Sequence, residues 1–135
     1  MAIRRIRKEG DPVLRTVCKP VTQFDESLCR LLDDMQETLK DAGGVGLAAP
    51  QVGIPKRLFI MDLGLPQMIE AINPQILKVS GKQHVVEGCL SCPDTWGYVD
   101  RPKRCRMRAQ NRKGEWYEMA FADLGAPVSY THLTL

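Results

Sequence analysis

Residues 25–44 have the sequence DESLCRLLDDMQETLKDAGG, which predicts a long helix and both of its ends. Apolar side chains recur in it at helical spacing and form one stripe, consisting of Leu28, Leu31, Leu32, Met35 and Leu39. Asp25 can accept a hydrogen bond from the first turn, and Gly43 can adopt the left-handed conformation that ends many helices. We therefore predict an amphipathic helix over residues 25–42 whose stripe faces a core.

Downstream of this helix the sequence predicts strands. An apolar run at residues 57–62 predicts a buried strand, and residues 71–74 predict a strand end or turn. Further strands are predicted at residues 76–80, 82–89, 103–110 and 116–121, with a hairpin turn at residues 111–114. One helix followed by short strands is an α+β pattern. We therefore predict an α+β fold in which an N-terminal helix packs on short, mostly antiparallel strands.

The composition is that of a single soluble globular domain. The 135 residues are 44% hydrophobic and 26% charged, which is ordinary for such a domain. No apolar run approaches the roughly 18 residues that span a bilayer, and the basic start is not followed by the apolar segment of a secretory signal. The 5 cysteines therefore indicate free thiols in a reducing compartment. We predict a cytoplasmic protein that has no membrane partner.

Basic residues gather between positions 101 and 113, although the net charge is only +3. They are Arg101, Lys103, Arg104, Arg106, Arg108, Arg112 and Lys113. Alternation of arginine with apolar residues is typical of a half-buried strand. The cluster is either a solvated basic face or a patch for an anionic partner such as ribosomal RNA. No aromatic residue is interleaved with it, so we expect neither base stacking nor sequence-specific nucleic-acid binding.

Two segments carry residues suited to chemistry. Residues 44–51 read GVGLAAPQ, a small-residue loop ending in Gln51, whose amide can donate a hydrogen bond. This loop is no phosphate loop, because the Gly-Lys-Ser/Thr of such loops does not follow. Residues 87–91 read EGCLS, in which Cys89 offers a thiolate, a good ligand for first-row metals.

A catalytic metal site needs about three protein ligands and one open position. The chain contains two histidines, His84 and His132. On an extended strand His84 points to the opposite face from Cys89, and His132 has no second histidine four residues away. The sequence therefore supplies one convincing metal ligand, Cys89.

These motifs, with the flanking segment 10–15 and the Asn73-Pro74 dipeptide, resemble peptide deformylase over residues 3–126. The family's third motif, a helical H-E-x-x-H expected near residue 130, is absent. The resemblance implies an incomplete deformylase-like domain over residues 1–126 that lacks the C-terminal metal-ligand helix. Residues 127–135 are similar to translated adapter sequence, and we expect this tail to be foreign to the fold.

The resemblance also implies an activity, the metal-dependent removal of the formyl group from N-formylmethionyl nascent peptides. In the family a cysteine and two histidines hold a divalent metal, natively Fe(II) and often replaced by zinc, nickel or cobalt; Cys89 takes the cysteine position. The metal activates water, and the motif glutamate acts as general base. Gln51 and the backbone N–H of Leu90 would stabilise the oxyanion, each donor typically contributing about 3–4 kcal/mol. The implied substrate-binding residues are Val45, Gly46, Glu87 and Trp96.

Two histidine ligands and the general base lack counterparts in this sequence. We therefore expect the chain itself to be inactive and the activity to belong to a full-length parent. The alternative is a non-catalytic deformylase-like module that binds peptides or associates with the ribosome near the exit tunnel. A third possibility is a thiol redox protein that uses Cys89 and Cys92, although the residues after Cys92 predict no helix to lower a thiol pKa.

Overall fold

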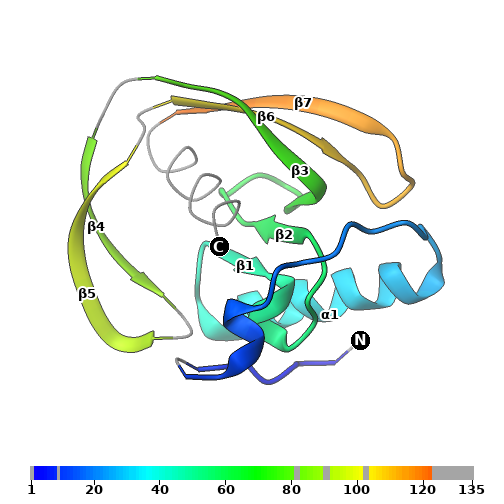
Figure 1. Cartoon of the computed structure of the whole chain (residues 1–135), viewed down its shortest axis with the longest axis horizontal. Coiled ribbons are helices and arrows are strands. Elements are labelled where there is room, and N and C mark those ends of the chain that lie inside the picture. The colour runs from blue at the N-terminus through cyan, green and yellow to red at the C-terminus, as the bar shows by residue number, and fades with distance from the viewer. Residues whose placement is uncertain (1, 9, 81–82, 90–91, 102–103, 123–135) are drawn as a thin grey trace.

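The computed structural model describes residues 2–8, 10–80, 83–89, 92–101 and 104–122; at 79–80, 83–89, 92–101 and 121–122 it describes the backbone only. Figure 1 shows a curved sheet with helix α1 (Glu26–Ala42) beneath it and a separate two-stranded ribbon at one side. The C-terminal stretch that was expected to lack the metal-ligand helix, and the predicted foreign tail at 127–135, lie outside the described residues.

The predicted helix and both of its ends are confirmed. The Asp25 carboxylate accepts a hydrogen bond from the Leu28 N–H at 3.0 Å, and Gly43 follows the last turn with a φ of 70°. All five residues of the predicted apolar stripe are buried. They pack against β1 and β2 in one continuous cluster, so the helix covers one face of the sheet.

The larger sheet has five antiparallel strands in the order β1-β2-β3-β6-β7. Its strands are β1 (Gly46–Ala48), β2 (Leu58–Met61), β3 (Ile69–Ser80), β6 (Arg104–Gln110) and β7 (Trp116–Ala122). A second sheet pairs β4 (Gln83–Cys89) with β5 (Cys92–Arg101). Two 3-10 turns, η1 (Pro12–Arg15) and η2 (Ala49–Val52), complete the described elements. The predicted α+β class is therefore confirmed.

Three details differ from the sequence-based expectation. The predicted break at residues 71–74 is wrong, because β3 runs through it with a register shift between Ile72 and Gln75. Asn73 sits at that shift with a φ of 51°, and its side chain bonds to the backbone of Val21 and to Gln110. These long-range bonds hold the bulge inside the strand. The other two differences are β1, which lies in a segment expected to be a loop, and β5, which was not predicted.

The core has two clusters, one on each face of the sheet. Strand β2 contributes to both, since Leu58 and Ile60 face α1 whereas Phe59 and Met61 face the other way. All four side chains are buried, so this interior strand contributes core residues on both faces of the sheet. Among the described residues, no helix combines the length and the apolarity needed to cross a bilayer.

Candidate functional site

Strand β1 forms one edge of the five-stranded sheet and contains the predicted substrate-binding residue Gly46. The N–H of Asp62 donates to the Val45 carbonyl at 2.7 Å, so Val45 and Asp62 form a hydrogen-bonded pair. Such pairs alternate along an antiparallel ladder, so the backbone groups of Gly46 and Ala48 point away from β2. An edge of this kind can bind an extended peptide as an additional strand. Both Val45 and Gly46 are half-buried.

Gln51 lies immediately after this edge strand, in the turn η2. Its side chain is 4% exposed, and its Oε1 accepts a hydrogen bond from the Ala48 N–H at 2.9 Å. The Gln51 carbonyl accepts a hydrogen bond from the Arg7 N–H at 2.6 Å, which fixes the backbone of the turn as well. Because the amide oxygen faces Ala48, the amide nitrogen, which is the donor, points away from that N–H group. The structure thus holds a preoriented donor beside an edge strand.

The second motif occupies the end of the smaller sheet. Strand β4 ends at Cys89, and its backbone pairs with Cys92 at the start of β5, after a register shift at Gly88. Trp96 is the backbone partner of Gly88 in the same hairpin. The hairpin therefore brings the backbones of the predicted residues Glu87, Cys89 and Trp96 together. Their side chains, and that of His84, lie outside the described part of the structure, as does the whole of Leu90.

The described side chains do not fit a complete metal centre. Among them there is no group of three or more histidine, cysteine, aspartate or glutamate residues that could hold an ion. Burial raises the pKa of the Cys105 thiol and, against the opposing charge of Arg57, that of Cys18. A raised pKa disfavours the thiolate that binds metals. Neither Cys105, which is buried, nor Cys18, which is half-buried, is therefore favoured as a metal ligand.

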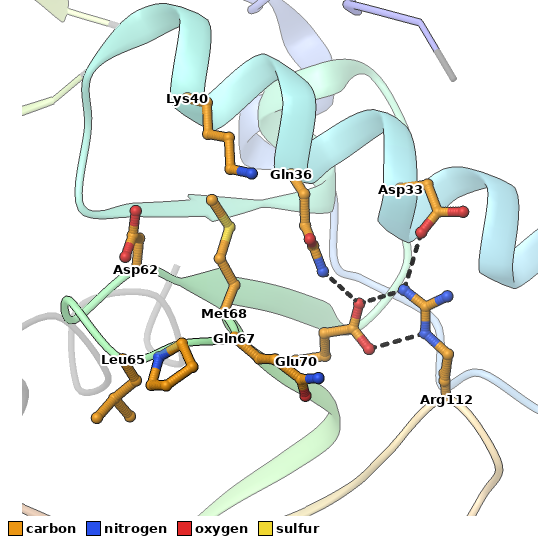
Figure 2. A pocket seen from close by; sticks show the side chains of 10 residues that line it. Asp33, Gln36, Lys40, Asp62, Leu65, Gln67, Met68, Glu70 and Arg112 are labelled. Atoms are coloured by element: carbon orange, nitrogen blue, oxygen red, sulfur yellow. Dashed lines mark hydrogen bonds and ion pairs between the residues drawn. The ribbon is translucent and has the colours of Figure 1, made fainter.

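A polar cavity of about 420 Å³ lies elsewhere, between α1, the turn at residues 62–68 and Arg112. Figure 2 shows Arg112 reaching from the β6–β7 turn toward α1 and β3. Its Nε and Nη2 donate to the two carboxylate oxygens of Glu70 at 2.9 and 2.5 Å, and Nη2 also reaches Asp33 Oδ1 at 3.1 Å. Gln36 donates to Glu70 Oε2 at 2.8 Å.

This cavity contains none of the predicted site residues, and Arg112, Glu70 and Asp33 in its lining are paired with one another. Ligand pockets are mostly apolar with a few convergent polar groups, so we assign the cluster of Arg112, Glu70, Asp33 and Gln36 to the fold. Burial beside Glu70 raises the pKa of Tyr117 to about 12. Its hydroxyl donates to the Glu70 carbonyl, which ties β7 to the same cluster.

Comparison with known proteins supports the family resemblance. A sequence profile described as "Polypeptide deformylase" matches residues 3–132. A peptide deformylase of Heliobacterium modesticaldum is 49% identical over 132 residues, covering 98% of this chain and 86% of that protein. One from Clostridium botulinum is 52% identical over 136 residues, covering 98% and 92%. The crystal structure of peptide deformylase from Thermotoga maritima superposes with a TM-score of 0.93 at 43% identity, covering 98% of this chain and 92% of that one.

Proposed function

The chain belongs to the polypeptide deformylase family, and from this premise we propose that it carries the peptide-binding part of an enzyme that deformylates N-formylmethionyl nascent peptides. The observation that supports this most is the buried amide of Gln51, held against Ala48 beside the edge strand β1. A buried polar side chain in an apolar surrounding needs a fixed partner. Here the Ala48 N–H fixes the amide oxygen, so the plane of the amide, and with it the position of the amide nitrogen, is set by the protein.

In this proposal the formylated peptide lies along β1. The N–H and carbonyl of Gly46 bond to the peptide backbone, and Val45 contacts its side chains. The amide nitrogen of Gln51 and the N–H of Leu90 donate to the formyl oxygen, where charge develops in the transition state. Each such donor contributes about 3–4 kcal/mol to the transition state. Glu87 and Trp96 complete the pocket.

We further propose that Cys89 is one ligand of a divalent metal, Fe(II) in the native enzyme or zinc, nickel or cobalt in its place. A bound metal supplies an acidic water and polarises the formyl carbonyl. The sequence holds two histidines and no H-E-x-x-H. The 135-residue chain is therefore expected to bind metal weakly and to release no formate. We take residues 1–126 as the domain, residues 127–135 as foreign to it, and the cytoplasm, where nascent chains emerge, as its location.

The test combines catalysis with binding. Formate release from a formyl-Met peptide is measured under anaerobic conditions with added Fe(II) or Ni(II), beside a Cys89→Ala control. No difference between the two chains is expected, and turnover above the control contradicts the proposed inactivity. Binding of the same peptide, labelled with a fluorophore, is expected for both.

The variant Gly46→Pro is designed to remove the N–H that points toward the peptide and to leave the β1–β2 hydrogen bonds in place. It should abolish peptide binding, whereas the matched variant Gly46→Ala retains that N–H and should bind. Equal binding by both variants would remove β1 as the peptide site.

The second candidate is a non-catalytic module that binds peptides or associates with the ribosome. It is favoured by the hydrogen bonds of Val45 and Gln51, which are made to other groups of the protein. The two candidates differ in the DNA after codon 126. An H-E-x-x-H encoded there, in any frame, favours the enzyme, whereas an unrelated tail favours the binding module.

A further inference from the structure

We propose that one face of β6, extended by neighbours on β3 and β7, is a binding surface for the phosphate backbone of unpaired RNA. This basic face consists of Arg104, Arg106 and Arg108 on β6, Lys78 on β3 and Trp116 on β7. The face lies on β6 rather than on β1. RNA binding can therefore be measured whether or not the chain hydrolyses formyl peptides.

The basic face arises from strict alternation along β6. Cys105, Met107 and Ala109 are 2%, 0% and 0% exposed and belong to the core cluster on one side of the sheet. The arginines between them must therefore point to the opposite side. Alternate residues on a strand are about 7 Å apart, a spacing comparable to that of successive phosphates along an extended RNA strand. Lys78 is the backbone partner of Arg106, which adds a cation beside the row.

The charge of this row is weakly compensated. Among the described residues that pair with it from β7, Glu118 is the one carboxylate, and its Oε1 lies 3.7 Å from Arg106 Nε. These two side chains are 55% and 62% exposed, so solvent screens the pair and it contributes little. Arg112, by contrast, is engaged with two carboxylates. Within the described part of the chain, the β6 arginines are thus balanced by one weak ion pair.

Trp116 gives the face an aromatic component that the sequence analysis did not expect. The linear sequence interleaves no aromatic residue with the arginines, but β7 places Trp116 so that Arg108 Cζ lies 3.9 Å from its ring centroid. The Trp116 side chain is nevertheless 45% exposed. An exposed indole with an adjacent guanidinium is a surface on which an unpaired base stacks.

These features favour RNA over an anionic membrane. Guanidinium groups bind phosphate oxygens in a bidentate fork, and a linear row of them suits a linear polyanion. Amphipathic segments that lie in a membrane surface insert apolar side chains below the headgroups, and the basic face contributes a single aromatic ring. Arginine without base-specific geometry also predicts little dependence on RNA sequence.

The experiment measures fluorescence anisotropy of a labelled unstructured RNA of about 16 nucleotides with the full chain at rising salt. Four phosphate contacts predict a slope of log K against log salt of about −3, since each contact on a single strand contributes about −0.7. The triple variant Arg104→Gln, Arg106→Gln, Arg108→Gln should flatten the slope by about 2 and weaken binding at least about tenfold at low salt. Trp116→Leu should weaken binding about tenfold.

The matched control removes the same charge from three exposed arginines elsewhere, in the variant Arg5→Gln, Arg15→Gln, Arg30→Gln. It should retain affinity within about threefold, because net charge alone acts weakly at moderate salt. Equal losses of RNA affinity in the two triple variants would overturn the proposal. So would binding to phosphatidylserine vesicles without binding to RNA.

If the β6 triple variant fails to fold by circular dichroism, Arg106→Gln alone is used. It should still flatten the slope by about 0.7, and an unchanged slope would overturn the proposal.

Discussion

Two parts of the protein bury polar side chains: the turn η2, with Gln51, and the cluster of Arg112, Glu70, Asp33 and Gln36. They differ in how far apart along the chain the hydrogen-bonded residues are. Gln51 bonds to Ala48, three residues before it, and both groups are neutral. Arg112 bonds to Glu70 and Asp33, which precede it by 42 and 79 residues, and all three groups are charged. The first contact orients one side chain, whereas the second joins α1, β3 and the β6–β7 turn.

This difference distinguishes a buried polar side chain of the candidate site from buried polar side chains that stabilise the fold. At Gln51 the contact with Ala48 holds a neutral amide in one orientation beside the edge strand β1. In the Arg112 cluster (Figure 2) the carboxylate of Glu70 is held by Arg112 and Gln36 together. A cluster whose charges are paired internally has less to offer a ligand. Its main effect should be on stability.

The largest expected effect is that of Arg112→Met. This change leaves the Glu70 carboxylate, 14% exposed, without its bidentate partner. Removing one member of a buried pair costs 3–5 kcal/mol, and the Arg112 side chain is 30% exposed, so we expect the free energy of unfolding to fall by about 3 kcal/mol. Urea denaturation followed by circular dichroism measures it.

Lys113→Met is the matched control, because Lys113 is the exposed neighbour of Arg112 in the same turn. Its effect should stay within about 0.5 kcal/mol. The double variant Arg112→Met, Glu70→Leu should recover part of the loss, since the buried Glu70 carboxylate is removed together with its partner and the Asp33 carboxylate, 38% exposed, stays solvated. If Arg112→Met were as stable as the control, the assignment of the cluster to the scaffold would be wrong.

A smaller loss of stability, together with a loss of binding, is expected for Gln51→Met. Methionine fills a similar volume but leaves the Ala48 N–H, in a residue that is 5% exposed, without its acceptor. An unsatisfied buried donor costs about 2 kcal/mol. The same variant should bind formyl-Met peptide more weakly, whereas Arg112→Met should bind it as the natural chain does under conditions where both are folded. If Gln51→Met bound the peptide as tightly as the natural chain, Gln51 would have no role in peptide binding and would differ from the Arg112 cluster only in its effect on stability.

The elements predicted best from sequence are those with local signals. The cap at Asp25, the stop at Gly43 and the apolar stripe between them all act within a few residues, and each is found in the structure. Strand β5 was missed because Pro93 and Gly97 are poor strand formers, and its pairing with β4 overrides that preference. The continuity of β3 was missed because the bonds of Asn73 reach Val21 and Gln110, which are 52 and 37 residues away.

The candidate site also has parts that the sequence predicted and parts that it could not predict. The motifs identified Gln51 and Gly46, and the structure adds that one is buried and the other lies on an edge strand. The roles of Cys89, Glu87 and Trp96 stay predictions, as does that of Leu90. The Arg112 cluster could not be predicted, because no sequence pattern links an arginine in a hairpin turn to carboxylates so far away along the chain.

The smallest expected effect on the free energy of unfolding is that of Asp34→Asn, and it should depend on pH because Asp34 is charged. The Asp34 carboxylate accepts hydrogen bonds from the Ala2 N–H at 2.7 Å and from Arg4 Nε at 3.0 Å, and its side chain is 7% exposed. Burial opposes its ionisation, but the Ala2 hydrogen bond and the Arg4 guanidinium together lower the pKa of Asp34 below its usual value. Replacing it in Asp34→Asn should cost about 1 kcal/mol at neutral pH.

Because the folded pKa of Asp34 is depressed, its contribution to stability is present above the unfolded value of about 3.9 and is lost as the pH falls through the folded pKa. The stability difference between the natural chain and Asp34→Asn should therefore shrink below about pH 4.

Two controls accompany this measurement. Asp41→Asn, an exposed change on the same helix, should differ in the free energy of unfolding from the natural chain by less than about 0.5 kcal/mol at neutral pH. The loss caused by Gln51→Met should not change with pH over this range, because neither Gln51 nor the Ala48 N–H titrates. Urea unfolding from neutral pH to about pH 3 measures all three. If the stability difference between the natural chain and Asp34→Asn were the same in acid as at neutral pH, the contribution of Asp34 would not depend on its charge. Asp34 would then behave like the neutral Gln51.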